Sequence, residues 1–196
     1  FIWTKRRDNR SPHHLRDNSR GSNESLDTSN TDFSSETDLS GNGDMTIIAN
    51  STIFPTNYTN GINRNSETFV AWQWRANGGS ASNSDGATSS TVQAAPGGGF
   101  SIVTYTGFSG SSGTSTVGHG MGVAPNMIIF KSRTRTSGWW TAAPGLFSSQ
   151  SHFIDLNGTG QPTDLSSYGT ISAPTTSVFT INGVDGVGGE SADYVA

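Results

Sequence analysis

The carboxylates are the first residues to consider for chemistry, because a glycoside-cleaving enzyme needs a pair of them. Such an enzyme holds two carboxyl groups roughly 5–10 Å apart across the sugar, usually on neighbouring positions of a strand. Glu24, Glu36 and Glu67 form no alternation with aspartate of the ExDxE kind. No GxSxG sequence marks a hydrolase nucleophile either. The sequence therefore indicates no catalytic residue.

Two glycine-rich turns carry the remaining groups that can hold an ion. Asp185, Glu190 and Asp193 surround one turn and can offer oxygens to calcium, but the spacing of an EF-hand loop is missing. The other turn, GHGMG at residues 118–122, precedes Pro125 and an apolar strand rather than the helix that a dinucleotide-binding loop opens. The four histidines form no zinc motif. We expect these glycines to turn the backbone, and we expect no metal and no cofactor.

The tryptophans are the remaining candidates for a ligand contact. Trp139 and Trp140 are adjacent in a predicted strand, so their side chains point to opposite faces of the sheet. We expect one of them in the core and the other exposed. An exposed Trp beside an amide is a common way to grip a sugar ring, so Trp139, Trp140 and Asn157 are the candidate ligand-binding residues. The alternative is that these aromatic rings pack against a neighbouring domain or chain.

The composition narrows the classes of function. The net charge of −4 does not favour nucleic acid, and the absence of cysteine removes disulfides and thiolate metal sites. A basic start with Lys5, Arg6, Arg16 and Arg20 is interrupted by aspartates and is typical of a solvated surface. No apolar run approaches the roughly 18 residues of a membrane span, and we expect no membrane insertion. FIWTKRR begins the chain in mid-strand, so we expect a piece of a longer protein.

The elements that must position these residues are short strands. In SIVTYT, residues 101–106, β-branched and aromatic residues alternate between the two faces and glycines bound the run. MIIF, residues 127–130, is continuously apolar and should be buried on both sides or lie in a sandwich core. Further strands are predicted at 1–7, 13–17, 46–48, 69–74, 139–142, 152–156, 177–181 and 194–196. With 13% charged residues and many Gly, Ser, Thr and Asn, the chain is predicted to be all-β, a sandwich with almost no helix.

An internal repeat of about 125 residues divides the chain. FIWTKRR matches MIIFKSR, HHLRD matches WWTAA, and ETFVA at 67–71 matches ADYVA at 192–196. The first copy lacks a counterpart of residues 99–126, so we expect each copy to need the other's missing strands or residues outside this chain. The predicted units are a partial β-sandwich repeat at 1–76, a Gly/Ser-rich linker at 77–98 and a second repeat at 99–196.

The motifs GFSIVTYTG, TVGHGMGVAP and MIIFKSR resemble a repeated domain of virion structural proteins of marine bacteriophages. Those domains are similar to the concanavalin-like lectin jelly roll. The resemblance implies two tandem antiparallel jelly-roll-like β-sandwiches, the first lacking its N-terminal strands. It also implies a tail fibre or appendage component located in the virion, and it carries no catalytic position over to this chain.

Three hypotheses for function follow. The first is an adhesive and structural virion protein that recognises the host surface, without enzymatic activity. The second is a capsid or tube decoration protein with a purely structural role, and the third, least favoured, is a glycan-degrading enzyme. Because the cores look thin and no disulfide helps them, we expect a homo-oligomer, most often a trimer in phage fibres. The other expected partners are virion proteins and a host-surface glycan.

Overall fold

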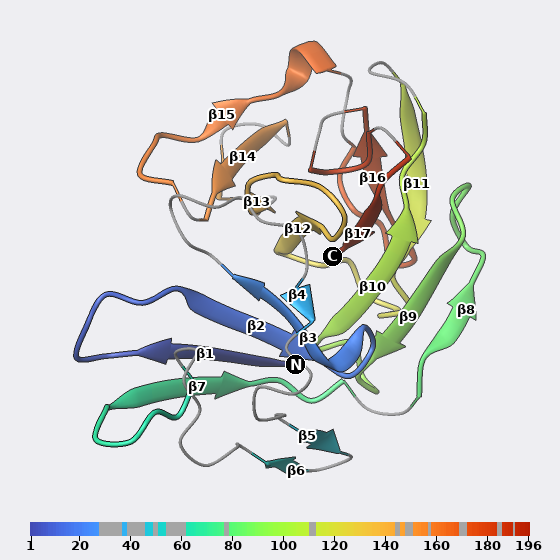
Figure 1. Ribbon diagram of the computed structural model, residues 1–196. Helices are drawn as coiled ribbons and strands as arrows, with labels where there is room; N and C mark the ends of the chain where they lie inside the picture. The colour runs from blue at the N-terminus through green and yellow to red at the C-terminus, as the bar shows by residue number, and fades with distance from the viewer. Residues whose placement is uncertain are drawn as a thin grey trace.

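The computed structural model describes residues 1–27, 37–38, 46–48, 51–53, 62–76, 79–109, 113–143, 146–147, 151–156, 158–168, 172–183, 186–189 and 191–196. Seventeen strands and one short 3-10 helix, η1 (Ser166–Tyr168), make up the regular structure of this part of the chain (Figure 1). All strand pairs are antiparallel apart from one isolated bridge. The described residues therefore confirm an all-β protein with almost no helix, consistent with a β-sandwich.

Two large sheets contain most of the strands. The first sheet has the order β4 (Thr37–Asp38), β3 (Gly21–Asp27), β2 (His13–Asp17), β1 (Ile2–Arg6) and β7 (Phe69–Gln73). The second sheet has the order β15 (Thr163–Asp164), β14 (His152–Asp155), β13 (Trp140–Ala142), β12 (Ile128–Ser132), β17 (Asp193–Val195), β10 (Ser101–Thr106), β9 (Ser90–Ala94) and β8 (Ala81–Asn83). Two two-stranded sheets complete the fold, β11 (Thr114–Gly118) with β16 (Val178–Asn182) and β5 (Thr46–Ile48) with β6 (Ser51–Ile53).

The sequence predicts a flexible linker or a long surface loop at 77–98, and the structure corrects this prediction. Residues 79–98 are described, and they contain β8 and β9 of the second sheet. β9 pairs with β10 over five residues, and Val92 and Gln93 are 8% and 2% exposed. The small polar residues suggested flexibility, but a strand between two partners is stabilised by its backbone hydrogen bonds, which do not depend on side-chain type.

The five strands of the first sheet recur in the second in the same order. β4-β3-β2-β1-β7 corresponds to β15-β14-β13-β12-β17 (Figure 1). The register agrees as well, because the pair Ile2 and Arg16 corresponds, 126 residues later, to the pair Ile128 and Ala142. The correspondence extends to the sheet edge, where Glu24 opposite Asp38 matches His152 opposite Asp164. The repeat seen in the sequence is therefore also a repeat of strand order and register.

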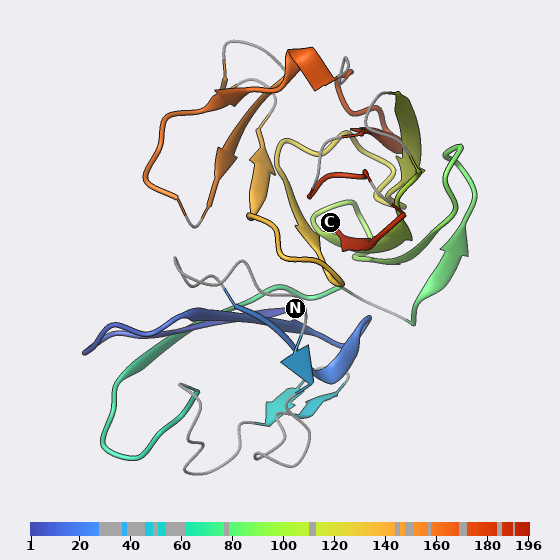
Figure 2. The same ribbon diagram turned by 45° about the horizontal axis from the view of Figure 1, so that its top comes forward.

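The two sheets pack face to face, and a third layer covers the far face of the second sheet. Figure 2 shows the blue strands of the first sheet lying beneath the second sheet. The cyan β5–β6 pair lies on the side of the first sheet that faces away from the second sheet. Between the sheets lies a small core of Leu15, Leu26 and Trp139. The larger core lies between the second sheet and the β11–β16 pair; its most buried members include Phe130, Phe153, Phe179, Ile181 and Tyr194.

Candidate functional site

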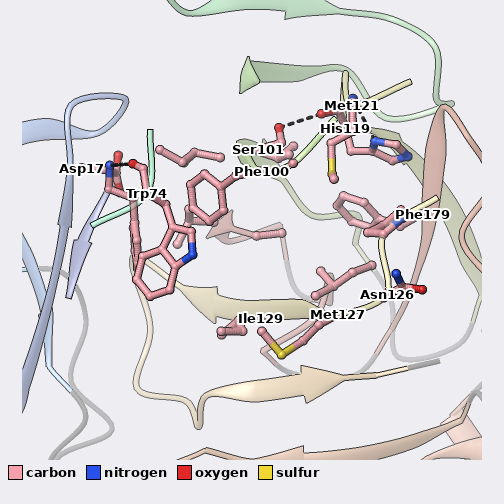
Figure 3. A pocket seen from close by; sticks show the side chains of 18 of the residues that line it. Asp17, Trp74, Phe100, Ser101, His119, Met121, Asn126, Met127, Ile129 and Phe179 are labelled. Atoms are coloured by element: carbon pink, nitrogen blue, oxygen red, sulfur yellow. Dashed lines mark hydrogen bonds between the residues drawn. The ribbon is translucent and has the colours of Figure 1, made fainter. Parts of the chain in front are cut away.

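A cavity of about 420 Å³ opens between the two sheets beside the core of Leu15, Leu26 and Trp139 (Figure 3). We call it the aromatic cavity. Its walls come from the start of β1, the end of β7, the approach to β10, the loop that follows β11, and β12. The side chains that define its character are Phe1, Trp74, Phe100, Met121, Met127 and Ile129.

Three aromatic rings form one wall of the aromatic cavity. Trp74 stacks on Phe100, with ring centroids 6.0 Å apart and planes 20° from parallel. Phe1 lies 5.4 Å from the ring of Trp74 and 5.5 Å from that of Phe100. The backbone fixes this arrangement, because Trp74 N donates to Phe1 O over 3.0 Å and Phe1 N donates to Trp74 O over 3.1 Å. An edge-strand residue is thereby held against the second sheet.

The facing wall is built from the loop that follows β11. Gly120 and Gly122 have φ angles of 67° and 73°, a conformation that glycine adopts without strain, so these residues turn the chain as the sequence predicts. The turn brings Met121 toward the cavity (Figure 3). Val123 and Met127 remain 46% and 58% exposed at its mouth. The mouth is therefore apolar on both sides, with Trp74 38% exposed opposite them.

The polar side chains of Asp17, Ser101 and His119 on the cavity walls have partners within the protein. Asp17 receives a hydrogen bond from Arg20 Nε over 2.5 Å, and both side chains are almost fully buried. Ser101 Oγ donates to the carbonyl oxygen of His119 over 2.7 Å. The imidazole of His119 accepts from Met121 N through Nδ1 and contacts Thr175 O through Nε2. The aromatic cavity is thus suited to an apolar group, such as an aliphatic or aromatic side chain of a partner.

Burial lowers the pKa of His119 below its ordinary value, although the carbonyl of Thr175 opposes this shift. The hydrogen-bond pattern agrees with a neutral ring, because Nδ1 must keep its lone pair to accept from Met121 N. His13 follows the same pattern, since Trp3 Nε1 donates to His13 Nδ1 over 2.7 Å and burial lowers the pKa of His13. Both histidines therefore favour their uncharged forms in the folded protein.

A second hollow, of about 470 Å³, has the opposite chemistry, and we call it the polar cleft. It lies over β8, β9, β10 and β17. Thr106 Oγ1 donates to Asp193 Oδ1 over 2.8 Å at one end, and Asn83 Nδ2 donates to Asp85 Oδ2 over 2.9 Å near the other. Its lining of hydroxyl, amide and charged groups suits a saccharide; the lining residues are Ser82, Asn83, Ser84, Ser89, Ser90, Thr91, Thr104, Tyr105, Thr106, Arg133 and Asp193.

The structure places Trp139 and Trp140 differently from the expectation that one of them is exposed. Trp139 is 4% exposed between the sheets, where its Nε1 donates to Asp27 O over 3.0 Å. Trp140 points to the other core, half-buried, with its ring 6.4 Å from Phe153. Both faces of this sheet are covered, so Trp139 is buried and Trp140 is only partly exposed. Asn157 lies outside the described residues.

The exposed tryptophans are Trp72 and Trp74, at and just beyond the end of β7. The sequence predicts that they share one apolar face with Val70, but it does not show that β7 ends a sheet. Trp72 is 45% exposed, and its ring meets that of Trp3 in an edge-to-face arrangement with ring centroids 5.9 Å apart. The residue type alone does not show which tryptophans are exposed. The position of Trp72 on an edge strand and of Trp74 just beyond its end does, and the sequence does not reveal that position.

The basic start of the chain is not a uniformly solvated surface. Arg16 and Arg20 are buried, in contrast to the expectation. Arg6 Nε lies 2.6 Å from Asp8 Oδ1, and Arg6 Nη1 lies 2.8 Å from Glu67 Oε1. Lys5 Nζ donates to Ser11 O. The side chains of Lys5, Arg6 and Arg20 are therefore engaged by partners within the chain.

No group of three or more metal-binding side chains gathers within the part of the chain that the structure describes. Asp185 and Glu190, which the sequence singles out for calcium, lie outside the described residues. Among the described residues no helix is long and apolar enough to cross a membrane.

Comparisons with known proteins identify a family without assigning it a role. A family model described as a domain of unknown function (DUF7483) matches residues 1–196. The chain therefore belongs to this family. No curated protein and no solved structure matches this chain.

Proposed function

We propose that this DUF7483 domain is a non-enzymatic structural and adhesive module of a bacteriophage virion protein, in a tail fibre or similar appendage. The observation that carries the proposal is the recurrence of one five-strand unit in the same register, with the two copies packed face to face. We interpret the two units as tandem jelly-roll-like β-sandwiches, the first without its N-terminal strands. Of the motifs that resemble those of virion structural proteins, MIIFKSR lies in β12 of the second unit, and GFSIVTYTG contains β10, which pairs with β17 of that unit.

The host-recognition part of the proposal rests on the polar cleft. Its floor presents hydroxyl groups from neighbouring strands, and Arg133 and Asp193 add one charge of each sign. Such a surface can exchange hydrogen bonds with several hydroxyls of a polysaccharide, each weak on its own. Repetition along a fibre then raises the overall affinity, because linked weak sites act together.

The experiment measures binding of the full chain to host-surface polysaccharides by calorimetry, together with release of reducing ends. We expect weak binding without cleavage. Replacing Thr91 and Thr104 by Val keeps the shape of the cleft and removes two hydroxyls, so binding should fall at least about tenfold. Thr163→Val, on exposed β15, is the matched control and should bind as the parent does. Cleavage of the glycan would reject the non-enzymatic role.

A purely structural role in capsid or tube decoration is the second candidate. It is favoured by the aromatic cavity, whose exposed apolar mouth of Trp74, Val123 and Met127 suits a protein neighbour better than a sugar. If no polysaccharide binds and the Val variants change nothing, the structural role replaces the adhesive one.

A further inference from the structure

The edge of β7 is the place where the two repeated units differ. In the second unit the equivalent strand, β17, lies between β12 and β10. In the first unit β7 pairs with β1, and none of the described residues pairs with its other edge. Tyr194 in β17 is fully buried, whereas its counterpart Phe69 is half-buried. Val70 is half-buried as well, and the last three residues of β7 are exposed.

The backbone of β7 shows which groups face this edge. Arg7 N donates to Thr68 O, as Arg133 N donates to Asp193 O at the equivalent position of the second unit. At the other end of β7, Trp74 and Phe1 exchange both of their backbone hydrogen bonds. Because pairing groups alternate along an antiparallel strand, those of Phe69 and Ala71 point away from β1 toward the edge.

The second unit shows what pairs with these groups. Ala196, the counterpart of Ala71, exchanges two backbone hydrogen bonds of 2.8 Å with Val103 of β10. Tyr194, the counterpart of Phe69, lies opposite Tyr105. Transferred to the first unit, the same register places a residue of the Ile102 type opposite Trp72. That residue would cover the indole that is 45% exposed.

We propose that the free edge of β7 binds a strand of the β10 type, SIVTYT in this chain, supplied by another repeat of the same kind. The strand adds to the first sheet in the antiparallel register that β10 has on β17, which is recognition by strand addition. Main-chain hydrogen bonds from Phe69 and Ala71 supply the attachment, and the alternating side chains supply the fit. This inference rests on strand register and is independent of the virion role.

The test extends the full chain at its N-terminus with a second copy of residues 79–126. That segment directly precedes the counterpart of Phe1 in the second unit, so it has the length to reach β7. We expect the amides of Phe69 and Ala71 to exchange with solvent at least about tenfold more slowly than in the unextended chain. The indole of Trp72 should also become less accessible to acrylamide.

The matched control replaces Val103 and Tyr105 by Pro in the added copy only. Proline removes the two amide groups that would pair with Ala71 and Phe69, so the protection should disappear. A peptide of residues 99–107 added to the unextended chain gives a second reading that does not depend on folding of the extension. Unchanged exchange with both the extension and the peptide, or equal protection by the proline control, would overturn the proposal.

Discussion

Trp139 of the second sheet donates a hydrogen bond from Nε1 to the backbone oxygen of Asp27 in the first sheet, over 3.0 Å. The indole lies in the core between the sheets, packed near Leu15 and Leu26. One side chain thus supplies both apolar contact and a polar link between two repeated units. This explains why an aromatic residue that looks like a ligand contact in the sequence is buried in the fold.

Replacing Trp139 by Ala should destabilise the protein by about 3–5 kcal/mol, because a large buried side chain is lost and a cavity remains. Trp139→Phe keeps most of the apolar contact but leaves Asp27 O without this donor, at a cost of about 1–3 kcal/mol. Urea unfolding measures both. Trp72→Ala, at an exposed indole, is the comparison and should cost less than about 1 kcal/mol. Equal losses for Trp139→Ala and Trp72→Ala would contradict this view of the interface.

Gly107, which ends the SIVTYTG motif, is predicted to accept no larger residue. A Cβ there would lie 2.3 Å from Gly188 O and 2.7 Å from Tyr194 Cε2. Gly107→Ala should therefore lower the free energy of unfolding by about 1–3 kcal/mol through overpacking. Gly99→Ala is the matched control, because a Cβ there meets nothing within 4 Å. Thermal melts that rank the two variants equally would show that Gly107 has room.

His13 and His119 make the stability of the folded protein depend on pH. The folded-state pKa values of His119 and His13 lie below the ordinary value, with burial as the main cause, so the unfolded chain binds protons first on acidification. Stability is therefore fully present above about pH 6.5 and falls as the pH drops below it. His119→Gln can preserve both hydrogen bonds without titrating, so it should flatten part of this dependence. Urea unfolding midpoints are measured from pH 7.5 to 5 for the parent protein and for His119→Gln. The same dependence of the midpoint on pH in the two proteins would refute the assignment.

The exposed mouth of the aromatic cavity leads us to expect a homo-oligomer, with a trimer as the proposed state. Light scattering on the full chain should give about three times the chain mass of 20.6 kDa. Met127→Lys places a charge at this mouth and should shift the particle toward a single chain, while Lys at exposed Thr163 should not. A single-chain mass for the parent protein at high concentration would contradict the proposed homo-oligomer.

Local patterns in the sequence predict the strands well where side chains alternate. SIVTYT and HHLRD are strands at the predicted positions, β10 and β2. The sequence does not predict β9 and β11 as strands, because their Ser, Thr and Gly residues are typical of linkers and loops. Their strand structure is stabilised by partners distant in sequence, such as β10 for β9 and β16 for β11.

The candidate site was harder to predict than the strands. Neighbouring positions in a strand point to opposite faces, but the sequence does not say that both faces of β13 are covered. Trp139 and Trp140 are consequently directed into two cores. The aromatic cavity joins Phe1, Trp74 and Phe100, which come from three separate strand ends, so only the tertiary structure brings them together.

The central claim is that one five-strand unit occurs twice and that its edge is open in the first copy. Amide hydrogen exchange of the unmodified full chain, read residue by residue by NMR, tests it directly. Val70 and Val195 face β1 and β12 and should both be protected. The amide of Ala196, bonded to Val103, should exchange at least about 100-fold more slowly than that of Ala71. Equal protection of Ala71 and Ala196 would contradict the claim.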